Sequence, residues 1–185
     1  FMQFLAEHGY VVCAHDQIGH GRSAAVNGTG YFAPKDGWDC LVRDVRQLTI
    51  LIRGRFPSLP VYLFGHSMGS FVSREYITRY KDLDGVILSG TGGSNPSAGA
   101  MAAVIRGMIP LKGEKFRSDW INDKMFGGFN QAFPEEESSF AWLTRDAAEV
   151  AKYEADPQCG FVFTLSGYAD LMTLIGRVSG EKWAK

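Results

Sequence analysis

The sequence predicts an α/β fold, in which helices cover a parallel sheet, and three observations carry that prediction. First, apolar runs of strand length occur at residues 10–14, 61–64 and 85–90. Second, an amphipathic pattern at residues 36–54 separates the first two runs, so that strands and helices alternate. Third, a Gly-x-Ser-x-Gly pattern lies between the second run and a helix-like stretch. Strands joined through helices require right-handed crossovers, and the sheet is therefore expected to be parallel.

The composition narrows the class of protein and of partner. The 185 residues suffice for one domain, and a net charge of −1 gives no reason to expect nucleic acid. The widely spaced Cys13, Cys40 and Cys159 indicate neither a disulfide framework nor a metal site, and they fit a reducing compartment. No apolar run approaches the roughly 20 residues that span a bilayer, and no secretory signal pattern is present. We therefore expect a cytoplasmic protein without a cofactor, with or without association with a membrane surface.

The first residues are predicted to form a helix that leads into the first strand. Gly9 is a natural stop for this helix, whose apolar spacing is set by Phe1, Phe4, Leu5 and His8. Because Phe1 already lies inside the helical pattern, we expect that a start before residue 1 is missing.

The loop that leaves the first strand, at residues 15–23, is expected to lie near the functional site. Loops at the carboxyl ends of parallel strands form the sites of such folds. This loop contains His15 and the run Gly19, His20, Gly21. For both histidines a structural hydrogen bond is favoured over a catalytic role. Residues 24–35 are predicted to be an exposed connection.

Residues 36–54 are predicted to form an amphipathic helix that lies on the sheet. Asp36 is expected to cap its amino terminus, with Asp39 three positions on. The apolar positions recur at intervals of three and four, and they are Trp38, Leu41, Val42, Val45, Leu48 and Ile52.

A nucleophile elbow, which is a strained strand-to-helix turn that presents a serine, is predicted between the second strand and the following helix. At Gly65 and Gly69 a Cβ is expected to obstruct the close approach of strand and helix, which explains glycine at both positions. Ser67 would then project alone into a pocket, with His66 and Met68 beside it in sequence. The alternative is an ordinary glycine-rich turn, and the strand before and the helix after favour the elbow.

After the third strand the alternation stops, and residues 94–160 are predicted to be helical. A helix at residues 101–109, ended by Pro110, is apolar on nearly every side. Two interpretations stay open, because this helix is either covered by the core or forms an apolar wall or a membrane-facing patch. Further helices are predicted at residues 142–155 and 167–185.

Three segments carry a resemblance to a known family. They are the loop His15-Asp16-Gln17-Ile18-Gly19-His20-Gly21-Arg22-Ser23, the elbow Gly65-His66-Ser67-Met68-Gly69, and the stretch Trp142-Leu143-Thr144-Arg145-Asp146 with Asp156-Pro157-Gln158-Cys159-Gly160-Phe161. Together they resemble the monoglyceride lipase and lysophospholipase branch of the α/β-hydrolases, often labelled serine aminopeptidase-like hydrolases. The resemblance covers essentially the whole chain, and Ser70 departs from it because a third glycine is commoner there.

The resemblance implies a partial α/β-hydrolase fold with a helical cap. Its parts would be a core at residues 1–93, a cap or lid at 94–160, and a return to the core at 161–185. Ser67 would be the acyl nucleophile, and the backbone N–H of Met68 would be one oxyanion donor. The implied substrate is a small lipid ester such as a monoacylglycerol or a lysophospholipid, with peripheral membrane contact through the cap. A serine aminopeptidase of the proline iminopeptidase kind is the other enzyme class left open.

The rest of the catalytic machinery is absent from the 185 residues. In this fold the triad acid and histidine follow the serine along the chain, and no histidine follows His66. The resemblance places the acid beyond Lys185 and the second oxyanion donor before Phe1. The favoured explanation is a longer hydrolase shortened at both ends, whose isolated 185 residues are inactive. The alternatives are a noncatalytic lipid-binding or scaffold protein, and a rearranged site in which His15 or His20 is the base.

Overall fold

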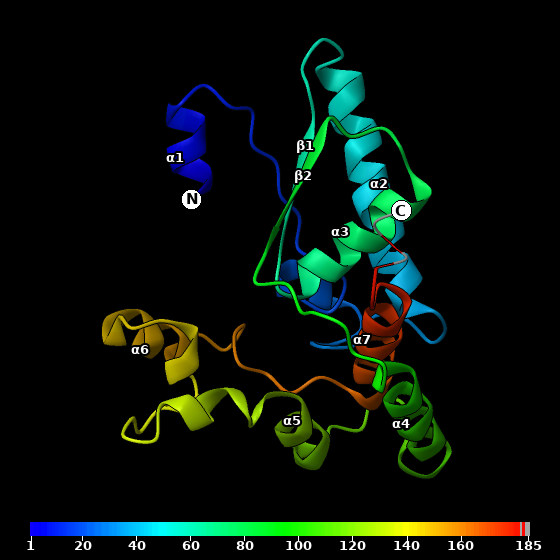
Figure 1. The fold of residues 1–185 in the computed structure, drawn as a ribbon, viewed down its shortest axis with the longest axis vertical. Coiled ribbons are helices and arrows are strands. Elements are labelled where there is room, and N and C mark those ends of the chain that lie inside the picture. Colours follow the sequence, from blue (N-terminus) through cyan, green and yellow to red (C-terminus); the bar gives the residue numbers. More distant parts are fainter. Residues whose placement is uncertain (182, 184–185) are drawn as a thin grey trace.

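The computed structural model describes residues 1–181 and 183 and contains a two-stranded parallel sheet. Strands β1 (Tyr62–His66) and β2 (Gly85–Ser89) pair with Tyr62 opposite Gly85 and His66 opposite Ser89. Helices α2 (Gly37–Arg55) and α3 (Met68–Arg79) lie on one side of the strands, and α1 (Met2–Glu7) lies on the other (Figure 1). The strands predicted at residues 61–64 and 85–90 are therefore confirmed, as is the alternation with helices.

The segment after β2 is helical, as the sequence predicts. It contains α4 (Ala98–Lys112), α5 (Asp119–Phe126), α6 (Ala147–Ala155) and the short 3₁₀ turns Phe129–Ala132 and Ala141–Leu143. The last helix, α7 (Leu165–Arg177), packs against α2, α3 and α4, and another 3₁₀ turn, Gly21–Ala25, precedes α2. In Figure 1, α4 to α6 lie together at the end of the molecule where β1 and β2 reach their carboxyl ends.

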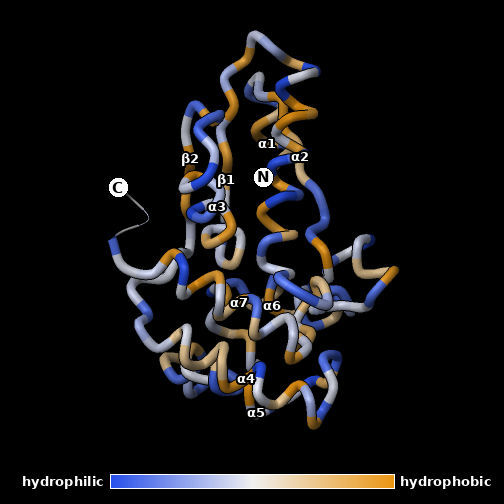
Figure 2. Tube along the Cα trace, turned by 90° about the vertical axis from the view of Figure 1, so that its right-hand side faces the viewer, coloured by the Kyte–Doolittle hydropathy of each residue, from blue (hydrophilic) through white to orange (hydrophobic). Residues whose placement is uncertain are grey.

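Helix α7 joins two apolar clusters. One cluster combines a buried loop residue with side chains of α2, α3 and α7, and its members are Phe32, Leu41, Val42, Val45, Val72, Tyr76 and Leu174. The other lies among α4, α5 and α7, and its members are Ala98, Ala102, Ile105, Ile121, Leu165, Tyr168, Ala169 and Met172. Along α2 the colours alternate between hydrophilic and hydrophobic, as an amphipathic helix requires (Figure 2).

The strand predicted at residues 10–14 is wrong. The backbone there has no strand hydrogen bonds, and Tyr10 and Val11 are exposed. Among the described residues β1 and β2 pair only with each other, so this apolar run has no neighbour that could form a ladder with it. Its composition suits a strand, but a strand exists only where a partner lies beside it.

The expected cap of the first long helix is also wrong. Asp36 has a left-handed backbone with φ of 50° and accepts no hydrogen bond with its side chain. The carboxylate of Asp170, from α7, lies at this helix terminus instead, and a Cβ on Gly37 would overlap its Oδ2. The connection expected to be exposed at residues 24–35 is also buried in part, because Tyr31 and Phe32 are each only 2% exposed.

Two helix boundaries differ from the prediction. Pro110 lies inside α4 rather than ending it, because the buried Ala98, Ala102 and Ile105 hold the helix against α7 despite the missing N–H. Helix α6 begins only at Ala147, where Asp146 accepts the backbone N–H of Ala148 at 2.9 Å. The helical prediction for residues 167–185 is confirmed to Arg177, and Lys182, Ala184 and Lys185 lie outside the described residues.

Candidate active site

Ser67 lies at a strained turn between β1 and α3. Its φ of 50° and ψ of −121° fall in a region that residues with a Cβ rarely occupy. Apart from Asp36, it is the one non-glycine residue with positive φ among residues 1–181 and 183. Such strain persists only where the surroundings enforce it, and it is concentrated at functional sites. The side chain is exposed, as a nucleophile that must meet a substrate requires.

The two glycines of the turn differ in what the structure demands of them. A Cβ on Gly65 would overlap Ser73 Oγ and the carbonyl oxygen of Gly69, and would lie 2.8 Å from the Gly69 carbonyl carbon. A Cβ on Gly69 would meet nothing within 4 Å. The steric expectation is therefore correct for Gly65 and wrong for Gly69.

Backbone hydrogen bonds hold Ser67 on both sides. Its N–H donates to the carbonyl of Ser89, at the end of β2, over 3.0 Å. Its carbonyl accepts the backbone N–H of Ser70 at 2.9 Å and the hydroxyl of Ser70 at 2.6 Å. The Ser70 hydroxyl is also 2.8 Å from the hydroxyl of Thr91, in the loop after β2. The sequence shows serine at position 70 in place of the commoner glycine, but it does not show that Ser70 contacts Thr91.

The three histidines nearest the site in sequence make other contacts. His66 Nδ1 is 3.1 Å from Ser89 Oγ, and its ring lies against Gly90. His20 Nδ1 donates to the Ile18 carbonyl at 3.2 Å. His15 lies near Asp44 on α2. Burial raises the pKa of the Asp44 carboxyl, and the nearby His15 partly offsets that rise. In the part of the chain that the structure describes, no histidine hydrogen-bonds the Ser67 hydroxyl.

His20 is enclosed by aromatic rings. Its ring centroid lies 5.4 to 6.1 Å from those of Phe161, Phe163 and Phe32. Burial lowers the pKa of His20, and the Ile18 carbonyl and the charge of Asp16 partly offset this effect. The half-buried imidazole therefore packs between the loop and the segment that precedes α7.

Glycine is required on both sides of His20. A Cβ on Gly19 would lie 2.8 Å from the Tyr31 carbonyl oxygen, and one on Gly21 would lie 2.5 Å from the Asp16 carboxyl carbon. Asp16 also accepts the backbone N–H of Arg22 at 2.9 Å. The Gly-His-Gly run thus shapes the loop around Asp16.

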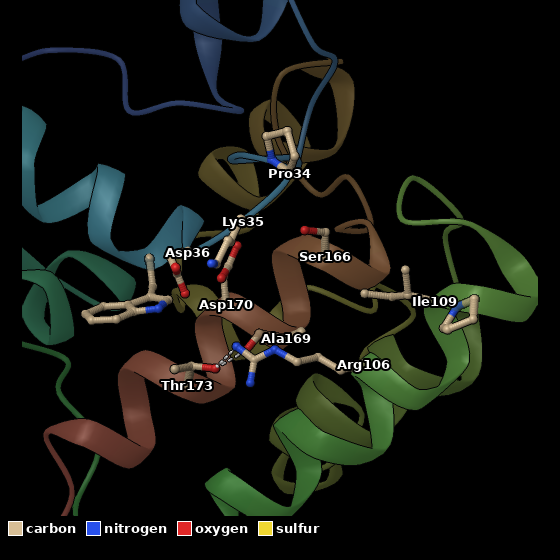
Figure 3. Close-up of a pocket in the computed structure, with 11 residues that line it drawn as sticks. Pro34, Lys35, Asp36, Arg106, Ile109, Ser166, Ala169, Asp170 and Thr173 are labelled. Atoms are coloured by element: carbon tan, nitrogen blue, oxygen red, sulfur yellow. Dashed lines mark hydrogen bonds between the residues drawn. The ribbon is translucent and has the colours of Figure 1, made fainter.

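A pocket of about 520 Å³ lies away from Ser67, among the start of α2, α4 and α7 (Figure 3). Its lining includes Lys35, Arg106 and Asp170, and Arg106 donates to Thr173 Oγ1 at 2.6 Å. Burial raises the pKa of Asp170 to about 6, although the backbone N–H groups of Trp38 and Gly37 favour the carboxylate. Ser67 lines neither this pocket nor a neighbouring one of about 380 Å³.

The helical segment that follows β2 combines a packed face with exposed apolar side chains. Ala102 and Ile105 of α4 are buried, whereas Val104 and Leu111 of the same helix are 56% and 87% exposed. Trp120 on α5 is 54% exposed. Packing against the core is therefore confirmed for one face of this helix, and the apolar wall or membrane-facing patch stays a prediction for the other. Within residues 1–181 and 183, no helix is both long and apolar enough to cross a bilayer, and no cluster of side chains suited to a metal is formed.

Comparison with known proteins extends these local observations to the whole chain. A family model described as serine aminopeptidase, S33, matches residues 1–181. A monoacylglycerol lipase of Mycolicibacterium smegmatis is 29% identical over 150 residues, which cover 80% of this chain and 46% of that protein. A monoglyceride lipase homolog of monkeypox virus is 45% identical over 69 residues, which cover 37% of this chain and 23% of that protein.

Solved structures show the same fold. A thermostable carboxyl esterase from Bacillus coagulans superposes with a TM-score of 0.89 at 26% identity, covering 99% of this chain and 60% of the esterase. A lipase in an open form superposes with a TM-score of 0.85 at 24% identity, covering 98% and 60%, and supports the fold alone. The chain thus spans less than half of these curated relatives and 60% of these structures.

Proposed function

Because this chain belongs to the serine aminopeptidase S33 family, in the monoglyceride lipase branch of the α/β-hydrolases, we propose that the protein hydrolyses carboxylic esters through an acyl-enzyme on Ser67. The observation that carries the proposal is the strained backbone of Ser67 between a parallel strand and a helix, with no room for a Cβ at Gly65. This geometry lifts one exposed hydroxyl out of the turn, which is what acyl transfer to a serine requires.

Each residue of the elbow has a role in the proposed reaction. The Ser67 hydroxyl attacks the ester carbonyl, and the backbone N–H of Met68 is one of two donors to the tetrahedral oxyanion. A serine hydroxyl is a weak nucleophile and needs a histidine base that a carboxylate orients. With no histidine after His66, we propose that the 185 residues alone are inactive and that a version extended at both ends is active.

The proposed substrates are monoacylglycerols or lysophospholipids. The names of the relatives support a lipid ester, and residues 94–160 would form the cap over an acyl pocket, between a core at 1–93 and a return at 161–185. Exposed apolar side chains at Val104, Leu111 and Trp120 would let the cap touch a membrane surface. A cytoplasmic location is part of the proposal, because Cys13, Cys40 and Cys159 are unpaired.

Two other functions remain as outcomes of the test. An aminopeptidase needs a carboxylate that holds a substrate ammonium close to the nucleophile, and the buried Asp170 lines a pocket that does not include Ser67. A noncatalytic lipid-binding or scaffold protein would retain the fold without the missing base.

The test compares hydrolysis of a monoacylglycerol with that of an aminoacyl amide by the extended protein, with Ser67→Ala as the control. We expect hydrolysis of the ester that is lost in Ser67→Ala. Preferred cleavage of the amide would support the aminopeptidase. Binding of monoacylglycerol without hydrolysis would support the noncatalytic protein.

A further inference from the structure

The hydroxyl of Ser70 contacts the carbonyl of the proposed nucleophile. Ser70 is fully buried, one turn of α3 after Ser67, and its Oγ lies 2.6 Å from the Ser67 carbonyl oxygen. A carbonyl can only accept, so the single proton of the Ser70 hydroxyl points at Ser67. The same hydroxyl also lies within donating distance of Thr91 Oγ1, at 2.8 Å, and the shorter of its two contacts is the one to the Ser67 carbonyl. A glycine at position 70 would supply neither contact.

This contact acts on the peptide unit that joins Ser67 to Met68. A trans peptide is planar, and its C=O and N–H point in opposite directions. The Ser67 carbonyl and the Met68 N–H belong to one such plane, so whatever orients the carbonyl also aims the N–H. Two donors from Ser70, the backbone N–H at 2.9 Å and the hydroxyl, hold the carbonyl.

We propose that Ser70 is a positioning residue, which acts through the Ser67–Met68 peptide to aim and polarise the Met68 N–H toward the oxyanion. Thr91 orients the Ser70 hydroxyl and so links the elbow to the loop after β2. Hydrogen bonds in a chain polarise one another, so a donor to the carbonyl makes the N–H of the same peptide a stronger donor. The catalytic part of this inference rests on Ser67 being the nucleophile, whereas the orientation of the peptide does not.

Ser73 offers a matched control for the alternative that Ser70 is merely a satisfied core serine. Ser73 is 2% exposed and lies on the same helix, and its hydroxyl donates to the Gly69 carbonyl at 2.8 Å. Ser73→Ala removes the same kind of bond from the Gly69–Ser70 peptide, whose N–H in turn donates to the Ser67 carbonyl, so its effect should reach Met68 one step further along the chain of hydrogen bonds and be weaker than that of Ser70→Ala. A general loosening of α3 would affect both variants alike.

The first experiment uses the 185-residue chain and needs no activity. The ¹⁵N and ¹H resonances of the Met68 amide are compared among the unchanged chain, Ser70→Ala, Thr91→Val and Ser73→Ala. We expect upfield shifts of the Met68 amide in Ser70→Ala, smaller effects in Thr91→Val, and a shift in Ser73→Ala that is clearly weaker than that in Ser70→Ala. A Met68 amide that is unaffected by Ser70→Ala, or equally affected by Ser73→Ala, overturns the positioning role.

The second experiment uses the extended protein with an ester substrate and with an alkyl trifluoromethyl ketone, which forms a tetrahedral adduct on a serine. In Ser70→Ala we expect kcat and the affinity for the ketone to fall together by roughly tenfold, as for one lost hydrogen bond, with KM nearly unchanged. Thr91→Ser should retain the unchanged protein's values. A rise in KM at constant kcat contradicts the inference. Absence of any Ser67-dependent hydrolysis contradicts the proposed function instead, and the Met68 resonances still decide the orientation of the peptide.

Discussion

A Cβ on Gly65 would overlap the carbonyl oxygen of Gly69, because the end of β1 and the first turn of α3 approach each other at this point. The carbonyl belongs to the helix that begins directly after Ser67, so the same approach bends the backbone of Ser67 into its strained conformation. Glycine at position 65 therefore allows β1 and α3 to approach closely enough to form the turn that exposes Ser67.

Gly65→Ala should destabilise the protein, whereas Gly69→Ala should not. The new methyl group at position 65 would overlap backbone atoms, which have no room to move, and we expect a loss of at least about 2 kcal/mol in the free energy of unfolding. At Gly69 the methyl group meets nothing within 4 Å, and removal of a helical glycine should stabilise by roughly 0.5–1 kcal/mol. Urea unfolding followed by tryptophan fluorescence measures both. Equal effects of the two substitutions would contradict the asymmetry.

Asp170→Asn should change how stability depends on pH. The folded pKa of about 6 lies above the unfolded value near 3.8, so the folded state holds this proton more tightly. The contribution of Asp170 to the free energy of unfolding is therefore fully present below about pH 4. It falls as the pH rises to 6 and stays lower above that value. Asparagine keeps an acceptor for the amino terminus of α2 and does not ionise.

We expect the unfolding free energy of the unchanged protein, relative to that of Asp170→Asn, to fall by on the order of 2 kcal/mol between pH 4 and pH 7. Urea titrations of both proteins across this range provide the measurement. A difference that is the same at every pH would show that Asp170 does not carry the raised pKa.

Glu75→Gln should weaken the contact between α3 and α7. The buried Glu75 Oε1 accepts from Arg79 Nη2 at 2.7 Å and from Arg177 Nη2 at 2.6 Å. Removal of this charge leaves two guanidinium groups beside each other without their shared anion, and we expect a loss of about 2–4 kcal/mol. The control is Glu149→Gln, which breaks an exposed pair with Lys152 and should cost less than about 0.5 kcal/mol. Comparable losses at both positions would show that Glu75 does not couple the helices.

The elements that were predicted correctly are those specified by local sequence. The apolar runs that became β1 and β2, the helical spacing of α2 and the glycine at position 65 each carry their own pattern. The run at residues 10–14 has the same composition as a strand, but strand pairing depends on a neighbour, and none lies beside it among the described residues. Pro110 breaks a local rule inside α4, where packing against α7 outweighs the lost hydrogen bond.

The parts of the site that sequence reasoning missed are contacts between distant residues. Asp170 replaces Asp36 at the start of α2, although 134 positions separate the two in the sequence. Only its being the single acidic residue of α7 distinguished it beforehand. Thr91 meets Ser70 because β2 ends beside the elbow, which is a consequence of the parallel register rather than of either residue.

The measurement that tests the central claim most directly is labelling by a fluorophosphonate probe, with the modified residue located by peptide mass spectrometry. This probe reacts with a serine that a base has activated. We predict labelling of Ser67 in the protein extended at both ends, no labelling after Ser67→Ala, and no labelling of the 185-residue chain, which has no histidine after His66. Strong labelling of Ser67 in the 185-residue chain, or an extended protein in which Ser67 stays unmodified, would contradict the account.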